Sequence, residues 1–421
     1  MPTAILGAVK RTLASALFWG GDSVKWASAI SEQPALLQAI AECQEEVNCQ
    51  LGPDVKPDLV VVFASAAHAG AFDQIPTDLQ RIYPGAIVMG CSGSGVIGDG
   101  REVEDSPGLS MVAAHLPGVV LSPFHIAPDQ LPSPDASPDE WVARVGVDQA
   151  QSPDFLLLAD PFSMAVDQMV EGLDYAFPGS AKIGGLASGA RRPGELSLFI
   201  NGHAERNGAV GIALSGNVIV DTVVAQGCRP VGRPMRVTKA DRNLLMELDD
   251  APPLQVLQEM YEHLPTGDQE LVQHSLFLGL AMDSLQEDVG PGDFLIRNVV
   301  GADPQKGVIS IGAMLQEGQT VQFHVRDAES SAQELQDRLH DYQNVVRGPS
   351  PEGALLFSCT GRGQYLYGRP DHDSELFRGA VGPLPMAGFF CSGEIGPVSG
   401  STYLHAYTSS FAVIRPRTAV D

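Results

Sequence analysis

Two stretches near the C-terminal end decide the fold: Leu355-Leu356-Phe357-Ser358-Cys359-Thr360-Gly361-Arg362-Gly363 and Ala387-Gly388-Phe389-Phe390-Cys391-Ser392-Gly393-Glu394-Ile395-Gly396-Pro397. Each is an apolar run of strand length that ends in a turn of small residues and glycine. Strands that end in glycine loops leave backbone N–H groups exposed at a sheet edge, where they can bind an anion. The first turn carries Arg362 and the second carries Glu394. This pair suits a small zwitterion, because a guanidinium grips a carboxylate with two prongs and a glutamate binds an amine.

The composition narrows the classes of partner. The chain has 421 residues, which predicts more than one domain. Its 44% hydrophobic and 18% charged residues are typical of a globular protein. The formal net charge is −25, and Arg191-Arg192 is the densest basic pair, so we expect no nucleic-acid partner. No apolar run approaches the roughly 20 residues of a membrane span, so we expect none.

The cysteines and the N-terminal segment indicate the cellular compartment of the protein. Six cysteines are scattered without a C-x-x-C pair, which argues against zinc ribbons and thioredoxin chemistry. Residues 4–19 are apolar, but Lys10 and Arg11 lie in their middle, which is not the order of a signal peptide. We expect an amphipathic helix that packs on the protein, with docking to a membrane surface as the alternative. Without a secretion signal, we expect a cytoplasmic protein with reduced thiols.

The order of predicted elements recurs along the chain. A helix is expected over residues 33–50, where Leu36, Leu37, Ile40 and Val47 form a stripe. The order strand, helix, strand, glycine loop is then predicted twice. The first copy has a strand at 59–63, a helix at 72–82, a strand at 86–89 and the loop 90–100. The second copy has a strand at 155–158, a helix at 163–177, a strand that ends at 183 and the loop 184–194. A third copy is expected over 354–390, and chance similarity is the alternative to this internal repeat. The fold class is α+β with α/β-like repeats, in two related sheet-rich halves covered by helices and packed in αββα layers.

Three motifs resemble the FIST family (F-box and intracellular signal transduction). They are residues 88–97 in the first half and residues 359–363 and 393–397 in the second half. The resemblance divides the chain into an N-terminal extension (1–25), a FIST N-like domain (26–230) and a FIST C-like domain (231–421). It implies a sensory signal-transduction module for a small ligand. No F-box or kinase sequence accompanies the halves, so we expect a separate signalling protein to carry the output.

Several alternatives remain at the sequence level. Residues 93–98 match the G-x-G-x-x-G fingerprint of dinucleotide sites, but a strand is predicted after them instead of the helix that binds the pyrophosphate. Cys91, Cys359 and Cys391 lie where strands meet glycine loops, so a cysteine-dependent hydrolase or transferase is one alternative, although no activating partner is evident. We therefore predict no catalytic residue. The simplest alternatives are that Arg362 pairs with an acidic neighbour and that Glu394 caps N–H groups.

Haem is the cofactor that the resemblance raises, because some family members are described as haem-based gas sensors. The ten histidines include no C-x-x-C-H attachment site, and no axial ligand can be named, although His68 and His405 lie near the glycine loops. No metal site is predicted.

We expect a groove between the halves to bind an amino acid or a similar small zwitterion. A protein-interaction adaptor without a ligand is the remaining alternative. The predicted site residues, on three loops, are Cys91, Ser92, Gly93, Ser94, Cys359, Gly361, Arg362, Gly363, Ser392, Gly393 and Glu394.

Overall fold

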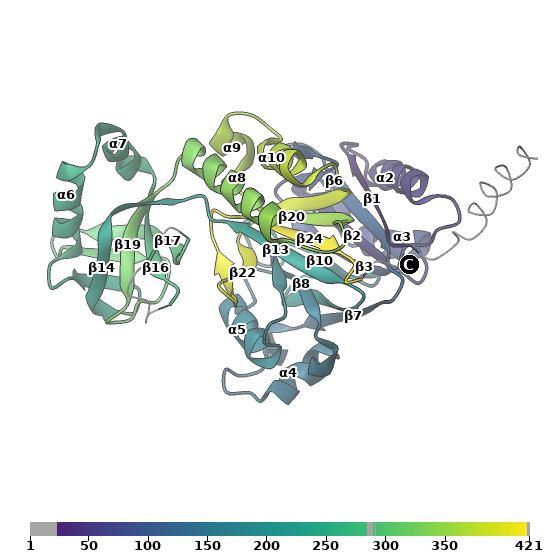
Figure 1. The fold of residues 1–421 in the computed structure, drawn as a ribbon, viewed down its shortest axis with the longest axis horizontal. Helices are drawn as coiled ribbons and strands as arrows, with labels where there is room; N and C mark the ends of the chain where they lie inside the picture. Colours follow the sequence, from purple (N-terminus) through teal and green to yellow (C-terminus); the bar gives the residue numbers. More distant parts are fainter. Residues whose placement is uncertain (1–22, 284–288, 291, 419–421) are drawn as a thin grey trace, which may run out of the picture.

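The computed structural model describes residues 23–283, 289–290 and 292–418 (Figure 1). The helix expected over residues 4–19 lies outside the described residues. Helices and sheets are both present, which confirms the α+β class. In the described part of the chain the strands form three six-stranded sheets and one closed barrel.

The first sheet unit spans residues 25–115. Its helix α2 forms because Leu36, Ile40, Cys43 and Val47 recur at helical spacing and are buried against β1 and β6. The helix predicted over 33–50 is therefore confirmed. The elements are β1 (Lys25–Ser31), α2 (Leu36–Leu51), β2 (Leu59–Ser65), η1 (Ala66–Ala71), α3 (Gln74–Ile82), β3 (Ile87–Gly93), β4 (Val96–Gly98), β5 (Arg101–Val103) and β6 (Leu109–His115).

The second and third units follow the same order of connections. The second comprises β7 (Val119–Ile126), α4 (Pro138–Val145), β8 (Asp154–Ala159), α5 (Val166–Ala176), β9 (Lys182–Leu186), β10 (Leu198–Ile200), β11 (His203–Glu205) and β12 (Ala209–Gly216). The third comprises β13 (Ile219–Ala225), α8 (Ala328–Val345), β20 (Gly353–Cys359), α9 (Gly363–Tyr367), α10 (His372–Val381), β21 (Met386–Cys391), β22 (Glu394–Val398), β23 (Ser401–His405) and β24 (Ser409–Arg415).

Each unit gives one hairpin to a neighbouring unit. The first sheet has the order β1-β6-β2-β3-β10-β11, so its last two strands come from the second unit. The second sheet, β23-β22-β9-β8-β12-β7, takes its hairpin from the third unit, and the third sheet, β13-β24-β20-β21-β4-β5, takes its hairpin from the first. The loop predicted over residues 90–100 therefore contains the end of β3 and the strand β4. The prediction missed β4 because its partner β21 lies far away in the sequence.

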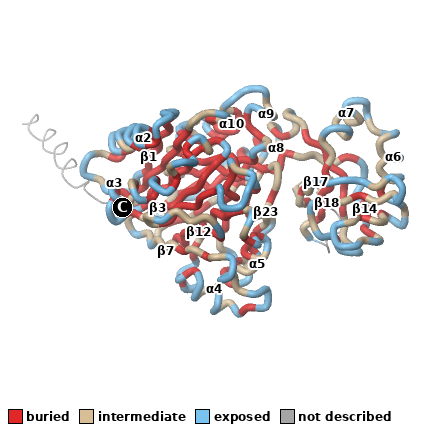
Figure 2. The backbone as a smooth tube through the Cα atoms, turned by 180° about the vertical axis from the view of Figure 1, so that it is seen from behind, coloured by how far each residue is buried: buried red, intermediate tan, exposed pale blue. Residues whose placement is uncertain are grey.

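A glycine at the same point of each unit allows the central parallel strands to approach closely. A Cβ atom at any of them would lie within about 2 Å of the carbonyl oxygen of the neighbouring strand, so no side chain fits there. These pairs are Gly90 with Val62 (1.8 Å), Gly184 with Leu157 (1.7 Å) and Gly388 with Leu356 (2.1 Å). The sheets share one apolar core, in which Phe63 stacks on Phe389 with ring centroids 4.8 Å apart. Figure 2 shows this core as the buried strands, with the more exposed helices around them.

A closed barrel interrupts the third unit between β13 and α8. Its strand order is β14-β15-β18-β17-β16-β19, and Figure 1 shows it as a lobe beside the three sheets. The predicted domain boundary between residues 230 and 231 falls within β14 and stays a prediction. The elements of the barrel are β14 (Arg229–Asp241), β15 (Leu244–Leu248), α6 (Pro253–His263), α7 (Thr266–His274), β16 (Leu276–Ala281), β17 (Phe294–Asp303), β18 (Val308–Ile311) and β19 (Thr320–Val325).

Candidate functional site

The three predicted glycine loops meet in the structure. The Thr360 N–H donates to the Cys391 carbonyl at 2.9 Å, which joins the loops after β20 and β21. The Phe390 N–H donates to the Gly95 carbonyl at 3.1 Å, and the Ser94 hydroxyl donates to the Phe390 carbonyl at 3.4 Å. The loop after β3 therefore contacts the same region. The loops after β20 and β21 meet because these strands are parallel neighbours and end at the same edge of a sheet. The strand β3 lies in another sheet, and its loop reaches them because β4, which follows the loop, pairs with β21.

Arg362 lies at the N-terminus of α9 and is fully buried. Its Nε donates to Asp373 Oδ2 at 2.7 Å and its Nη2 to Asp373 Oδ1 at 3.1 Å, so the two-pronged edge of the guanidinium already binds a carboxylate. Nη2 also donates to the Tyr367 hydroxyl at 2.6 Å, and Nη1 to the Tyr407 carbonyl at 3.4 Å. Burial alone would raise the pKa of Asp373, but the charge and hydrogen bonds of Arg362 outweigh burial and hold that pKa below its usual value.

Arg326 is a second buried arginine at the same junction, and the sequence prediction missed it. It follows the last strand of the barrel, is 7% exposed and lies over the ring of Tyr407, with 5.0 Å from its Cζ to the ring centroid. Its Nε and Nη2 have no hydrogen-bond partner among the described residues. These atoms form the same edge that Arg362 uses to hold Asp373. Nothing in Val325-Arg326-Asp327 distinguishes this arginine from a surface residue, so only the tertiary structure shows it.

Tyr407 contacts both arginines and has an unusual backbone conformation. Its φ is 67°, in the left-handed region that residues with a side chain rarely adopt. In this conformation its carbonyl accepts from Arg362, and its ring lies under Arg326. Strained residues of this kind cluster at functional sites, so the conformation agrees with a binding role for the junction.

Glu394 supplies a buried acid. Its Oε2 accepts the Thr408 N–H at 3.0 Å, while Oε1 has no partner among the described residues. Burial raises the pKa of Glu394 to about 8, although the neighbouring Arg362 and Arg326 oppose this shift. The group is therefore protonated over much of the neutral range and can either donate a hydrogen bond or, once ionised, pair with a cation.

The cysteines of the site are buried thiols. Burial, followed by the charge of Glu394, raises the pKa of Cys359 to about 11. Burial also raises the pKa of Cys91 and Cys391 well above the usual value. Since the thiolate is the nucleophile, these values do not favour the cysteine-dependent enzyme considered from the sequence.

The glycines allow close packing around the arginines. A Cβ at Gly361 would lie 3.2 Å from Arg326 Nη1 and 3.9 Å from Cys359 Sγ, so this position borders the free guanidinium. Gly363 has a φ of 60°, and a Cβ there would lie 2.5 Å from Glu104 Oε1. Glu104 accepts the Gln364 N–H at 2.8 Å and so ties α9 to the end of β5.

The remaining predicted residues hold the units together. Ser92 Oγ accepts the Ser197 N–H at 3.1 Å, and the Ser94 N–H donates to Ser188 Oγ at 2.8 Å. The Gly93–Gly98 fingerprint contains β4 and is followed by β5, not by a helix. The Ser392 N–H donates to the Leu186 carbonyl, and the Gly393 carbonyl accepts the Leu186 N–H. These contacts occupy backbone groups that a ligand would otherwise use.

The histidines of the described residues give little support to a haem site. Among the described residues, no group of three or more His, Cys, Asp or Glu side chains could hold a metal ion. His405 is buried and its Nε2 lies 3.0 Å from the Gly396 carbonyl, and burial lowers its pKa to about 4. Buried His68 has an unpartnered Nε2, and burial lowers its pKa, so its neutral ring could act as a ligand. Haem therefore stays an untested alternative, and no axial ligand is assigned.

Comparisons with known proteins give the family. The FIST N domain matches residues 58–251 and the FIST C domain matches residues 253–397. An uncharacterized protein of Mycobacterium tuberculosis is 35% identical over 384 residues, which cover 91% of this chain and 98% of that protein. One of Mycobacterium bovis is 37% identical over 382 residues (90% and 96%). An F-box/LRR-repeat protein of Arabidopsis thaliana is 27% identical over 135 residues, 28% of this chain and 25% of that protein.

A solved structure of a cyanuric acid hydrolase from A. caulinodans aligns over 94% of this chain and all of its own, with 9% identity and a TM-score of 0.38, from which we draw no argument. Within the described residues, no helix combines the length and apolar character needed to cross a bilayer. The two domain matches cover most of the sequence, and the resemblance noted from the loop motifs is confirmed. The chain belongs to the FIST family.

Proposed function

We propose that this chain is a sensory module that binds a small zwitterion, such as an amino acid, where the third sheet unit meets the barrel. The FIST family is associated with signal transduction and the sensing of small ligands. The observation that carries the finer proposal is the free Nε–Nη2 edge of Arg326, which is buried without a partner.

The carboxylate of the ligand is assigned to Arg326. A buried guanidinium edge without hydrogen-bond partners is costly, because it has lost its water and gained no acceptor. A carboxylate on this unpartnered edge would remove that cost with two parallel hydrogen bonds. Arg362, the residue expected from the sequence to take the carboxylate, has the same edge filled by Asp373. We therefore give Arg362 the role of a fixed neighbour that orients Tyr407.

The amine of the ligand is assigned to Glu394, as expected from the sequence. Oε1 of this residue has no partner among the described residues, and the side chain lies close enough to Arg326 and Arg362 for their charges to lower its pKa. A ligand ammonium would stabilise the ionised glutamate and so draw its pKa down. Binding of a zwitterion would thus release a proton at neutral pH.

A thermal-shift screen of free amino acids and small carboxylates tests the proposal. A ligand at 100 times its Kd adds about 2.7 kcal/mol to the native state, which should raise Tm by roughly 5–10 °C. Arg326→Gln should abolish the shift without lowering the Tm of the free protein, because it removes an unpaired charge. Arg233→Gln, at an arginine in the barrel with 71% side-chain exposure, is the matched control and should keep the shift. A flat screen, or a shift that survives Arg326→Gln, would refute this assignment.

A further inference from the structure

We propose that the free edge of β13 docks an extended, basic segment of a partner protein as an additional strand of the third sheet. This inference stands independently of the ligand assigned to Arg326. β13 is the outermost strand of its sheet and, among the described residues, pairs only with β24. A strand edge of this kind is a template for another chain.

The hydrogen bonds at its two ends show which backbone groups face outward. The Val220 N–H donates to Asp154 Oδ2 at 3.1 Å, and the Gln226 N–H donates to Glu334 Oε1 at 3.1 Å. Alternate residues of an antiparallel strand point to the same edge, so Thr222 and Val224 also face outward. The two carboxylates thus close the ends of the edge and leave a window between them. Within the described chain, no strand pairs with the backbone of Thr222 or Val224 on this side.

The corresponding strands of the other two units have protected edges. In β1 the amide of Gln50 imitates a paired strand: Oε1 accepts the Ser28 N–H at 3.0 Å, and Nε2 donates to the Ser28 carbonyl at 2.9 Å. In β7, Pro123 removes a backbone donor, and proline in a strand is typical of a protected edge. The window of β13 has neither device. Among the described residues, each of these devices protects one position of its strand, and the Thr222–Val224 stretch of β13 has none.

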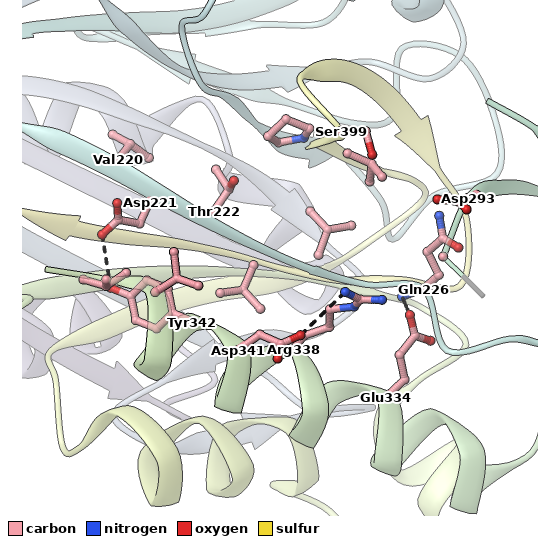
Figure 3. Close-up of a pocket in the computed structure, with 17 residues that line it drawn as sticks. Val220, Asp221, Thr222, Gln226, Asp293, Glu334, Arg338, Asp341, Tyr342 and Ser399 are labelled. Atoms are coloured by element: carbon pink, nitrogen blue, oxygen red, sulfur yellow. Dashed lines mark hydrogen bonds and ion pairs between the residues drawn. The ribbon is translucent and has the colours of Figure 1, made fainter. Parts of the chain in front are cut away.

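A groove of about 650 Å³ borders this window (Figure 3). One wall is α8, where Val345 is 74% exposed, and the opposite wall is the end of β22 at Pro397 and Val398. Gln226 lies at one end of the groove, is 4% exposed, and its Nε2 has no partner among the described residues. The groove therefore offers strand-pairing groups, apolar walls and one buried donor. A second copy of this chain, whose formal net charge is −25, would bring further acidic groups to the groove.

The charges of the groove indicate the chemistry of that segment. Among the described residues that line the groove, Arg338 is the single basic one, and its Nη1 lies 3.8 Å from Asp341. One further carboxylate is paired from outside the lining, since Arg415 Nε lies 2.6 Å from Asp221. Even with Asp293 left out and Arg415 counted, the lining has more carboxylates than guanidinium groups, so we expect lysine or arginine beside apolar residues in the partner. The acidic lining residues are Asp221, Asp293, Glu334 and Asp341.

Hydrogen exchange on the full chain tests whether the edge is open. The Thr222 and Val224 amides should exchange faster than those of Asp221 and Val223, which pair with β24. Protection of Thr222 and Val224 in the free monomer would overturn the proposal. Protection that appears only as the protein dimerises would assign the edge to a second copy and also overturn it.

Binding is measured by fluorescence anisotropy with labelled nine-residue peptides that alternate β-branched residues with lysine, threonine or glutamate. The lysine series should bind at least tenfold more tightly than the glutamate series and should protect Thr222 and Val224. Thr222→Pro, which removes one outward N–H, should weaken binding roughly tenfold, while the matched Thr222→Ala should change it less than about twofold. Val345→Lys, at an exposed position, separates loss of the groove from misfolding and should weaken the lysine series. If no peptide of the lysine series binds with a Kd below 100 μM, or if Thr222→Pro and Val345→Lys leave the Kd unchanged, the proposal is wrong.

Discussion

Replacing Arg362 with methionine should destabilise the protein strongly, because it leaves the Asp373 carboxylate buried without its cation. Both groups are almost inaccessible to solvent, and two hydrogen bonds of 2.7 and 3.1 Å join them. Breaking a buried ion pair on one side costs about 3–5 kcal/mol, which corresponds to a fall in Tm of roughly 6–20 °C. The double variant Arg362→Met/Asp373→Leu should recover most of that loss, since it removes both charges.

The effect should depend on pH with a defined sign. In the wild type Arg362 holds the pKa of Asp373 below its usual value, so this pair stabilises the protein above about pH 4 and the contribution is lost as pH falls. In Arg362→Met the hydrogen bond and charge of His372 still oppose burial, but the effect of Arg362 is lost. The pKa of Asp373 should therefore rise, and the variant should be least destabilised near pH 4 and most near pH 7. Thermal melts followed by circular dichroism at pH 4 and pH 7 measure the Tm difference between the variant and the wild type.

Arg369→Met is the matched control, because the Arg369–Glu375 pair is exposed and should contribute nothing measurable. The reasoning would be refuted if Arg362→Met lowered Tm no more than Arg369→Met does, or if Arg362→Met/Asp373→Leu were as unstable as Arg362→Met.

Three further predictions follow from the buried groups and close contacts. Burial raises the pKa of Glu394 to about 8, so the stability that its protonated form contributes is present below pH 4 and is lost as pH rises through 8. The Tm of the wild type should therefore fall between pH 5 and 9, and this fall should be absent in Glu394→Gln. A fall of the same size in the variant would contradict the prediction. Gly388→Ala should abolish folding or lower Tm by more than 10 °C, whereas the control Gly379→Ala, in α10 with open space around it, should be neutral or stabilise by about 0.5–1 kcal/mol; equal Tm values would refute the contact. Alkylation at pH 8 should modify exposed Cys49 first, and a faster buried thiol, identified by mass spectrometry, would revive a cysteine nucleophile.

The sequence predicted the parts of the fold that depend on local pattern. The stripe of α2 and the three glycine loops were visible because apolar periodicity and glycine turns are local signals. The α+β class was predictable for the same reason.

The rest depends on contacts between distant residues. The exchange of hairpins was not predictable, because nothing in Val96–Gly98 points to β21. The pairing of Arg362 with Asp373 was only one of two open alternatives, since the glycines beside Arg362 suit a ligand equally well. Arg326 was missed altogether, because its importance lies in hydrogen bonds that are absent among the described residues, not in its neighbours along the chain.

The exchange of hairpins also sets a schedule for folding on the ribosome. Gly98 of β4 pairs with Ala387 of β21, so the two partners are 387 − 98 = 289 positions apart. At 5–20 residues per second, β4 and β5 wait roughly 15–60 s for their sheet to be synthesised. The hairpin β22–β23 can join the second sheet only after residue 405 has been made. The hairpin β4–β5 and the β9 edge of the second sheet therefore stay unpaired until about residues 390–405 have been made, and a nascent chain that stalls earlier presents them to its neighbours.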